Sequence, residues 1–221
     1  MSSITFNISF PIVHVAIDIQ SRYFDVGDPF PATARNFADG LSIRGIPTVW
    51  VALTNALKHG SFKKEIPHGT YCDFGSDKDP QFVTRLGLSE VSPTYTEAIF
   101  VKNFSNAFER NLLAHILKQK RTEAIIISGL KSTDCVANSV AGALRNDFTV
   151  IIVSDLLQGP RYVSYKEDVL QSSALEKVSP DSKTKLLFAS MQEILNTFEA
   201  KLMPPRSSIQ LSPLKMATLA F

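Results

Sequence analysis

Three polar or reactive residues interrupt otherwise apolar parts of the sequence. Asp18 lies within the apolar run 13–19, Lys102 directly follows the apolar run 98–101, and Cys135 follows a short turn. If these side chains meet, they can perform nucleophilic catalysis, because the carboxylate can accept the thiol proton while the lysine stabilises the resulting charges. We therefore predict Asp18, Lys102 and Cys135 as the catalytic residues of a site that uses no histidine.

Cys135 has a position that suits a nucleophile. Residues 128–136 run from a strand through a turn into a helix, so Cys135 falls in the first helical turn, near backbone N–H groups and the positive end of the helix dipole. Both favour the thiolate, and the N–H groups can also hold the oxyanion that forms when a carbonyl carbon is attacked. The alternative is a small apolar residue buried between helix and sheet.

Asp18 and Lys102 have structural alternatives as well. A carboxylate between apolar residues is costly unless it is paired or hydrogen-bonded, so Asp18 would otherwise anchor a neighbouring loop. Lysine is rarely buried without a partner, so Lys102 would otherwise be a solvated residue just beyond its strand. Convergence of all three residues at one place favours catalysis over these separate structural roles.

The elements that must position these residues follow an alternating pattern. Short apolar runs alternate with amphipathic segments, which is typical of a parallel sheet covered by helices. The segment Ser190–Glu193 has the form of a capping box, which predicts the start of a last helix. The predicted strands are 12–19, 47–53, 97–102, 123–128, 148–154 and 185–189, and the predicted helices are 29–45, 107–119, 134–146, 165–178 and 191–202.

This pattern predicts a three-layer α/β fold of six mainly parallel strands with helices on both faces. In such a sheet, ligands bind outside the carboxyl ends of the strands, where the strand order reverses. Asp18 and Lys102 lie at the ends of strands one and three, and Cys135 follows strand four. The three residues would therefore meet at one edge of the sheet if strands one and four flank this switch point.

The sequence predicts one domain over residues 1–202 and a tail over residues 203–221. Residues 54–80 form a long polar stretch within the domain, and a loop of this length is usually functional. The tail combines prolines with serine and several large apolar residues. We expect it to be flexible or, because of these apolar residues, to pack on another subunit or partner.

Composition excludes several classes of protein. Hydrophobic residues make up 44% and charged residues 20% of the 221 residues, so the chain as a whole is not intrinsically disordered. The net charge of +2 comes from Arg206 and Lys215 in the tail, which contains no acid, so the domain itself is formally neutral. A neutral domain does not favour a nucleic acid or an anionic membrane as partner.

The same composition bears on the compartment. The longest apolar run, 49–53, is far shorter than the roughly 20 residues of a membrane helix. No basic residue precedes Arg22, so the N-terminus does not resemble a secretory signal. Two cysteines, Cys72 and Cys135, form no disulfide framework in a chain of this length. We expect a soluble cytoplasmic protein with no membrane partner.

Three motifs, taken together, resemble those of the isochorismatase-like cysteine hydrolases. Their order and spacing match the family, and the resemblance covers about residues 12–200. The motifs are Ala16–Gln20 followed by Phe24, Phe100–Lys102 followed by Ala107–Phe108, and Ser128–Leu130 followed by Thr133–Val136 and Ala143.

The resemblance implies roles for particular residues. It implies a doubly wound α/β sheet with strand order 3-2-1-4-5-6. It also implies a catalytic triad of Asp18, Lys102 and Cys135, and a cis peptide bond between Leu130 and Lys131. The backbone N–H groups of Lys131 and Cys135 would then form an oxyanion hole. Members of the family are commonly dimers or tetramers, so we expect a homodimer or homotetramer.

Two residues of the first motif are candidates for contact with a small-molecule substrate. Phe24 follows the strand-one aspartate closely enough to form a pocket wall, and Gln20 lies between the two. We therefore predict Gln20 and Phe24 as substrate-binding residues.

The resemblance also bears on metal binding. Nicotinamidases of this family hold a metal with an Asp-x-His pair and a further histidine, and those positions correspond here to Leu53, Asn55 and His59. Two of the three ligands are absent, and a lone histidine would hold a divalent metal poorly. We predict no metal, no cofactor and a substrate other than nicotinamide, with His59 as an ordinary loop residue.

These inferences predict a metal-independent hydrolase that cleaves a C–N bond of a small amide or carbamoyl compound through a covalent acyl-enzyme. Two alternatives stay open. The chain could be a non-catalytic family member that works by binding a partner. It could also hydrolyse a vinyl ether of the isochorismate type, where water attacks and Cys135 would be replaceable at modest cost.

Overall fold

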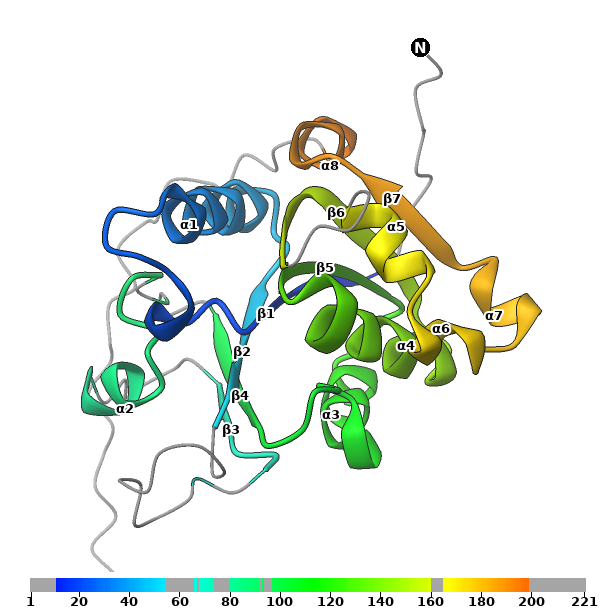
Figure 1. The fold of residues 1–221 in the computed structure, drawn as a ribbon, viewed down its shortest axis with the longest axis horizontal. Helices are drawn as coiled ribbons and strands as arrows, with labels where there is room; N and C mark the ends of the chain where they lie inside the picture. The colour runs from blue at the N-terminus through cyan, green and yellow to red at the C-terminus, as the bar shows by residue number, and fades with distance from the viewer. Residues whose placement is uncertain are drawn as a thin grey trace, which may run out of the picture.

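The computed structural model describes residues 11–54, 66, 68–73, 80–91, 93, 97–159 and 165–198. Its centre is a twisted sheet that runs through the middle of the molecule (Figure 1). Strand order is β3-β4-β2-β1-β5-β6-β7, with every neighbouring pair parallel except β3 and β4. The strands are β1 (Ile12–Ile17), β2 (Thr48–Leu53), β3 (Tyr71–Asp73), β4 (Ala98–Lys102), β5 (Ala124–Leu130), β6 (Thr149–Gln158) and β7 (Leu186–Ala189).

The predicted doubly wound α/β fold is confirmed. The six parallel strands are the six predicted ones, and their spatial order is the predicted 3-2-1-4-5-6. The antiparallel edge strand β3 was not predicted. Its three residues pair with Phe100, Ile99 and Ala98 of β4, and they lie inside the polar stretch that was predicted as a loop.

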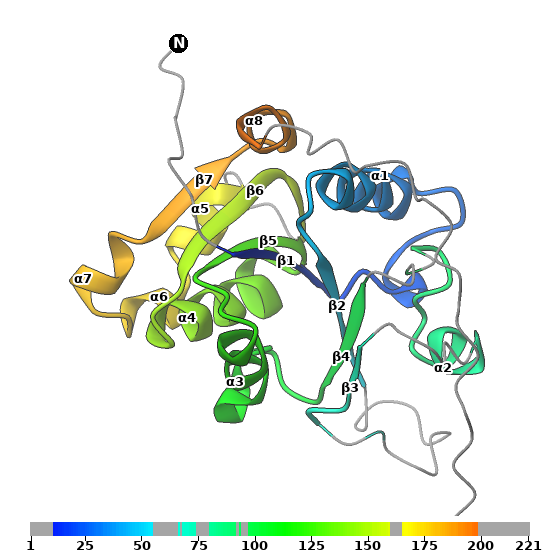
Figure 2. The same ribbon diagram turned by 180° about the vertical axis from the view of Figure 1, so that it is seen from behind.

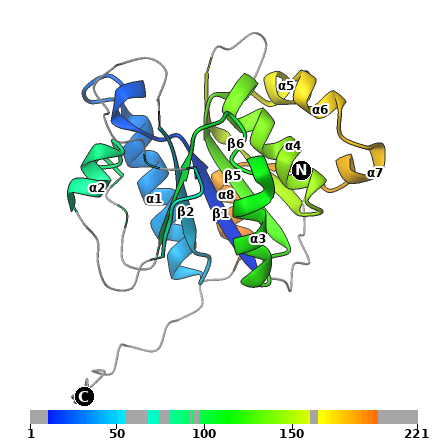
Figure 3. The ribbon, with the colours of Figure 1, turned by 90° about the horizontal axis from the view of Figure 1, so that it is seen from below.

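Helices cover both faces of the sheet (Figure 2). Viewed from below, α1 and α2 lie on one side of the sheet and α3 to α7 on the other (Figure 3). The described helices are α1 (Pro29–Ile43), α2 (Pro80–Arg85), α3 (Leu112–Gln119), α4 (Ala137–Arg145), α5 (Tyr165–Leu170), α6 (Ser173–Glu176), α7 (Pro180–Lys183) and α8 (Met191–Thr197), with the short turns η1 (Ser21–Tyr23), η2 (Glu109–Asn111) and η3 (Ser132–Val136).

Each face of the sheet has its own apolar core. The cluster that contains Phe108, Leu113 and Val140 packs α3 and α4 against one face. The cluster that contains Phe37, Leu41 and Ile194 packs α1 and α8 against the other. Because successive residues of a strand point to opposite faces, strands with both faces buried must be apolar throughout, as the predicted strands are.

Local signals explain where several helices begin. Asp28 accepts a hydrogen bond from the backbone N–H of Phe30, and Pro29 follows at the first helical position of α1. The predicted capping box at Ser190 and Glu193 is confirmed at the start of α8. These bonds use backbone N–H groups that have no partner inside the helix.

Other boundaries differ from the prediction. The helix predicted over residues 165–178 is two short helices, α5 and α6, because the chain breaks at Ser172, whose side chain caps α6. The helix predicted over 134–146 begins as the π-helical turn η3. The last helix ends at Thr197, short of residue 202. The predicted tail over 203–221 lies outside the described residues. No described helix is long and apolar enough to cross a membrane.

His14 is a buried polar residue in the middle of the sheet. Its Nδ1 lies 3.1 Å from Thr48 Oγ1 and its Nε2 lies 2.8 Å from Ser128 Oγ, so the ring connects three adjacent strands. Burial, with a smaller effect of the Arg35 charge, lowers the pKa of His14 to about 3. His14 is therefore a hydrogen-bonded core residue, and it is neutral at physiological pH.

The low pKa of His14 makes stability depend on pH. The unfolded chain takes up this proton below about pH 6.5, whereas the folded chain takes it up only near the lowered value, so stability falls as pH falls through that window. We expect His14 to lower the free energy of unfolding by about 2–3 kcal/mol when the pH falls from about 7 to about 4.5. Urea unfolding at the two pH values measures it. H14Q should lose this dependence, whereas H115Q, at an exposed histidine, should keep it.

Candidate active site

Asp18 lies immediately beyond the carboxyl end of β1. Its backbone adopts a φ of 54°, a left-handed conformation that aspartate tolerates better than most residues, and its N–H donates to the Val51 carbonyl at 2.9 Å. The side chain is only 2% exposed. The turn at Asp18 therefore ends β1 and leaves a carboxylate buried at the edge of the sheet.

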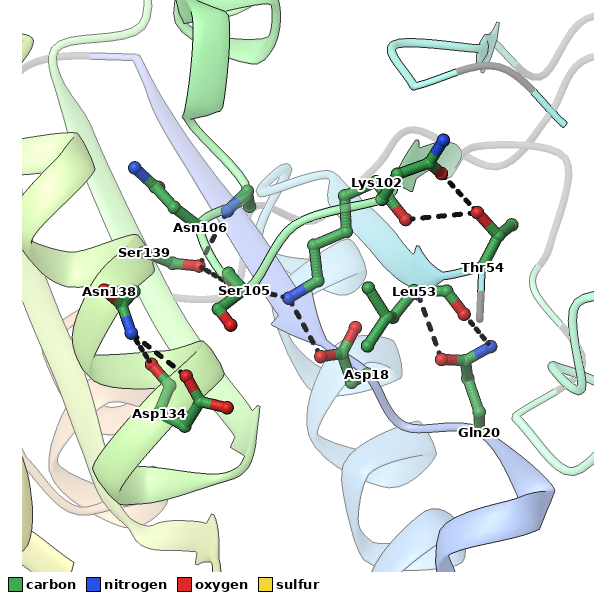
Figure 4. A network of polar contacts seen from close by, with 12 residues as sticks. Asp18, Gln20, Leu53, Thr54, Lys102, Ser105, Asn106, Asp134, Asn138 and Ser139 are labelled. Atoms are coloured by element: carbon green, nitrogen blue, oxygen red, sulfur yellow. Dashed lines mark hydrogen bonds and ion pairs between the residues drawn. The ribbon is translucent and has the colours of Figure 1, made fainter. Parts of the chain in front are cut away.

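Lys102 is the last residue of β4 and is fully buried. Its Nζ lies 2.9 Å from Asp18 Oδ2 and donates to the Ser105 carbonyl at 2.8 Å. Figure 4 shows the ammonium group between these two partners. The unusual charge at the end of an apolar strand is thus paired across the intervening strand β2, as a buried lysine requires.

Cys135 lies in η3, the turn that follows β5, and is 7% exposed. Strand β5 pairs with β1 in a register that places Gly129 opposite Ile17, so the turn begins beside Asp18. Hydrogen bonding between the Asp18 and Cys135 side chains affects the pKa of both groups. The structure therefore brings together all three predicted residues, and the predicted cis peptide bond between Leu130 and Lys131 is present.

The electrostatics of this pair differ from the expectation of a thiolate. Burial, together with a smaller effect of the negative charge of Asp18, raises the pKa of Cys135 to about 12, and the nearby Lys102 offsets only part of this rise. Burial also raises the pKa of Asp18 above its ordinary value, against the opposing effect of Lys102. The thiol is therefore protonated at rest, and the carboxylate beside it is a stronger base than an exposed aspartate.

Asp18 has few partners that would compete for its role as a base. Apart from Lys102 and the thiol, no hydrogen-bond donor among the described residues reaches either carboxylate oxygen. A buried carboxylate normally collects several donors, and each one would lower its basicity. This arrangement can accept a proton from Cys135 and return it, which is the chemistry of general base and general acid catalysis.

Gly129 makes the close approach of β1 and β5 possible. Its φ is +118°, and a Cβ at this position would lie 2.0 Å from the Ile17 carbonyl oxygen. Any side chain here would push apart the strand ends that carry Asp18 and Cys135.

We expect G129A to lower the free energy of unfolding by about 3 kcal/mol or more, because it adds a backbone clash to an unfavourable φ. Urea unfolding measures the change. Gly27 supplies the control, since it also has a positive φ of +88° but would place a Cβ in open space. G27A should therefore cost less, and equal losses for the two variants would contradict the close-approach argument.

Several residues that support the site were missed by the sequence analysis. Ser139, fully buried on α4, accepts a hydrogen bond from Ala107 N–H at 3.0 Å and so holds the loop whose Ser105 carbonyl binds Lys102 (Figure 4). Ser132, also buried, donates to Asp168 of α5 at 3.1 Å and holds the turn before Cys135. Small polar residues in helices and turns gave no signal in the sequence.

Gln20 is 2% exposed, and its amide is occupied by backbone groups. Its Oε1 accepts from the Leu53 N–H at 3.0 Å, and its Nε2 donates to the carbonyls of Leu53 and Leu86. These bonds give Gln20 a positioning role that the sequence did not suggest. Phe24 is partly buried and stacks on Phe30 with ring centroids 5.5 Å apart. Contact of either side chain with substrate stays a prediction.

The residues described near the site do not form a metal centre. Leu53, at the position of one nicotinamidase ligand, has an aliphatic side chain that cannot bind a metal. No group of three or more His, Cys, Asp or Glu side chains suited to a metal occurs in the described part of the chain. Asn55 and His59 lie outside the described residues, so a metal-free site stays a prediction.

Comparison with known proteins gives one family. The Isochorismatase domain matches residues 13–179 of this chain. No curated protein sequence matches the chain significantly.

Solved structures share the fold at low sequence identity. N-carbamoylsarcosine amidase from Thermoplasma acidophilum has a TM-score of 0.57 and 16% identity, over 82% of this chain and 97% of the amidase. Pyrazinamidase of Pyrococcus horikoshii, in complex with zinc, has a TM-score of 0.57 and 18% identity, over 81% and 99% of the two chains. A putative hydrolase of the isochorismatase family from Chromobacterium violaceum has a TM-score of 0.62 and 15% identity, over 90% and 98%.

Proposed function

Since this chain belongs to the isochorismatase family of hydrolases, we propose that it is a metal-independent cysteine hydrolase that cleaves a C–N bond of a small amide or carbamoyl compound. The observation that carries the proposal is the buried Asp18–Lys102 ion pair beside the Cys135 thiol. Two of the structural neighbours, N-carbamoylsarcosine amidase and pyrazinamidase, are named for reactions of the same class.

The first half of the reaction forms a thioester. Asp18 accepts the thiol proton as the sulfur of Cys135 attacks the carbonyl carbon, so a free thiolate need not accumulate at rest. The negative charge on the carbonyl oxygen is held by the backbone N–H groups of Lys131 and Cys135. Asp18 then gives its proton to the leaving nitrogen, the C–N bond breaks, and an amine or ammonia leaves.

The second half consumes water. Asp18, ionised again, removes a proton from a water molecule that attacks the thioester carbon. The C–S bond breaks, the acid product leaves, and the Cys135 sulfur regains its proton from Asp18. Throughout both halves, the ammonium group of Lys102 stabilises the ionised form of Asp18 and keeps its oxygen atoms directed towards the thiol.

A panel of primary amides, ureides and carbamoyl amino acids, assayed for release of ammonia, tests the proposal. We expect the protein to hydrolyse at least one of these classes of compound, and we expect this turnover to require Cys135. Turnover that survives C135A, or hydrolysis only of a vinyl ether without release of ammonia, would point to attack by water instead. Failure of every compound, with no covalent adduct on Cys135, would favour a binding protein.

A further inference from the structure

Arg22 lies at the same edge of the sheet as the proposed catalytic residues. It belongs to η1, which follows β1 directly. Its Nη2 donates to the Leu53 carbonyl and, at 3.3 Å, to Gln20 Oε1. Leu53 is the register partner of Lys102 in the adjacent strand β4, so these bonds hold the guanidinium beside the strand ends that carry Asp18 and Lys102.

Gln20 holds in place the backbone of Leu53, to which Arg22 is hydrogen-bonded. The Gln20 amide binds both the N–H and the carbonyl of Leu53, as Figure 4 shows. Arg22 is therefore hydrogen-bonded to a backbone segment that Gln20, in the turn after Asp18, holds in place. A guanidinium that is held in advance loses less freedom when it binds a ligand than a mobile one does.

The charge of Arg22 has no anionic partner among the described residues, since none of their carboxylates lies within 4.0 Å of its guanidinium. The residue is exposed, its hydrogen bonds to Gln20 and Leu53 both use Nη2, and its guanidinium lies over the Tyr23 ring, 4.8 Å from the ring centroid. The second cation of this edge, the buried Lys102, is neutralised by Asp18. Among the described residues, the positive charge of Arg22 thus remains beside the site without a counter-charge.

Electrostatic effects connect this charge with the reacting groups. The positive charge of Arg22 acts to lower the pKa of Asp18. The adjacent Tyr23 has a raised pKa, chiefly through burial, and the charges of Asp18 and Cys135 raise it further while Arg22 opposes them. Arg22 and the Tyr23 hydroxyl therefore lie within the electrostatic reach of the thiol and carboxylate, where a bound substrate must lie.

A guanidinium presents parallel N–H donors that match the two oxygens of a carboxylate. A single uncompensated charge matches a monoanion better than a phosphate, which carries nearly two charges. We propose that Arg22 binds a carboxylate group of the substrate, so that the compounds hydrolysed are small amides or carbamoyl compounds that carry an acid. This inference rests on the proposed function and specifies its substrate class.

Binding to the C135A variant tests the inference without turnover. The probes are N-carbamoylglycine and N-carbamoylglycinamide, which differ only in carboxylate against carboxamide, titrated by calorimetry. We expect the carboxylate to bind about tenfold more tightly, the scale of one ion pair near a protein surface. R22Q in the C135A background should remove this preference.

R145Q is the matched control. Arg145 is also an exposed arginine that donates from Nη2 to a backbone carbonyl, that of Ala174, but it lies at the end of α4. The C135A/R145Q variant should keep the preference. Equal affinities in C135A, no binding of either probe, or a preference that survives R22Q would each overturn the proposal. Failure of the proposed function is distinguishable, because it shows in the ammonia assay, either as release that survives C135A or as no release by the wild type from any compound.

Discussion

Replacement of Cys135 by alanine is expected to lower turnover by a factor of about 10⁵ or more, because removal of a covalent nucleophile leaves only binding and oxyanion stabilisation. The fold should persist, since the change removes one sulfur atom from a residue that is already small. The rate of ammonia release under saturating substrate measures the first effect, and the midpoint of thermal unfolding measures the second.

Cys72 provides the control for this experiment. It lies in the edge strand β3 and has no role in the sequence motifs that select Cys135. C72A should keep the turnover of the wild type within about twofold, because the residue belongs to none of the motifs that form the proposed site. A C135A variant that retains a tenth of the activity would be incompatible with a nucleophilic role for this residue.

Asp18→Asn is expected to reduce turnover by a factor of about 10²–10⁴, the usual contribution of a general base. The change keeps the shape of the side chain but removes the group that accepts the thiol proton. It also leaves the Lys102 ammonium buried without its counter-charge, which should cost about 3–5 kcal/mol of unfolding free energy. Ammonia release and urea unfolding measure the two effects separately.

A double variant separates chemistry from stability. In D18N/K102M the buried positive charge is removed together with its partner, and methionine fills a similar volume. We expect much of the lost stability to return, while turnover stays as low as in D18N. Recovery of turnover in the double variant would mean that Asp18 serves only to neutralise Lys102.

The parallel sheet and the meeting of the three candidate residues could be predicted because both depend on simple features of the sequence, whereas the strand order was implied by the family resemblance. Strands buried on both faces leave continuous apolar runs, and the carboxyl ends of parallel strands share one edge. A charge at such an end, as at Asp18 or Lys102, needs a partner, and the neighbouring strand ends are where one can be found.

The protonated thiol could not be predicted in the same way. The sequence indicates that Cys135 begins a helix, where the dipole favours the thiolate. It does not indicate that the sulfur is buried against a carboxylate, and burial and the charge of Asp18 together raise the pKa to about 12. Whether the pKa of Cys135 rises or falls depends on how deeply the thiol is buried. Cys135 is 7% exposed, and only the folded structure specifies this burial.

Other differences have similar causes. The strand β3 exists through hydrogen bonds with the edge of β4, so its three residues carry no apolar pattern of their own. The occupied amide of Gln20 and the anchored guanidinium of Arg22 depend on the position of Leu53, a residue of the neighbouring strand. Contacts between residues more than 30 positions apart leave no local signature.

The central claim is that the reaction passes through a thioester on Cys135. Rapid acid quenching during turnover, followed by mass spectrometry of the intact protein, tests it most directly. We expect the wild type to gain the mass of the acyl group, located on the peptide that contains Cys135, while the C135A variant gains none. Steady turnover by a wild-type enzyme that carries no adduct at any quench time, with unchanged turnover by C135A, would contradict the claim.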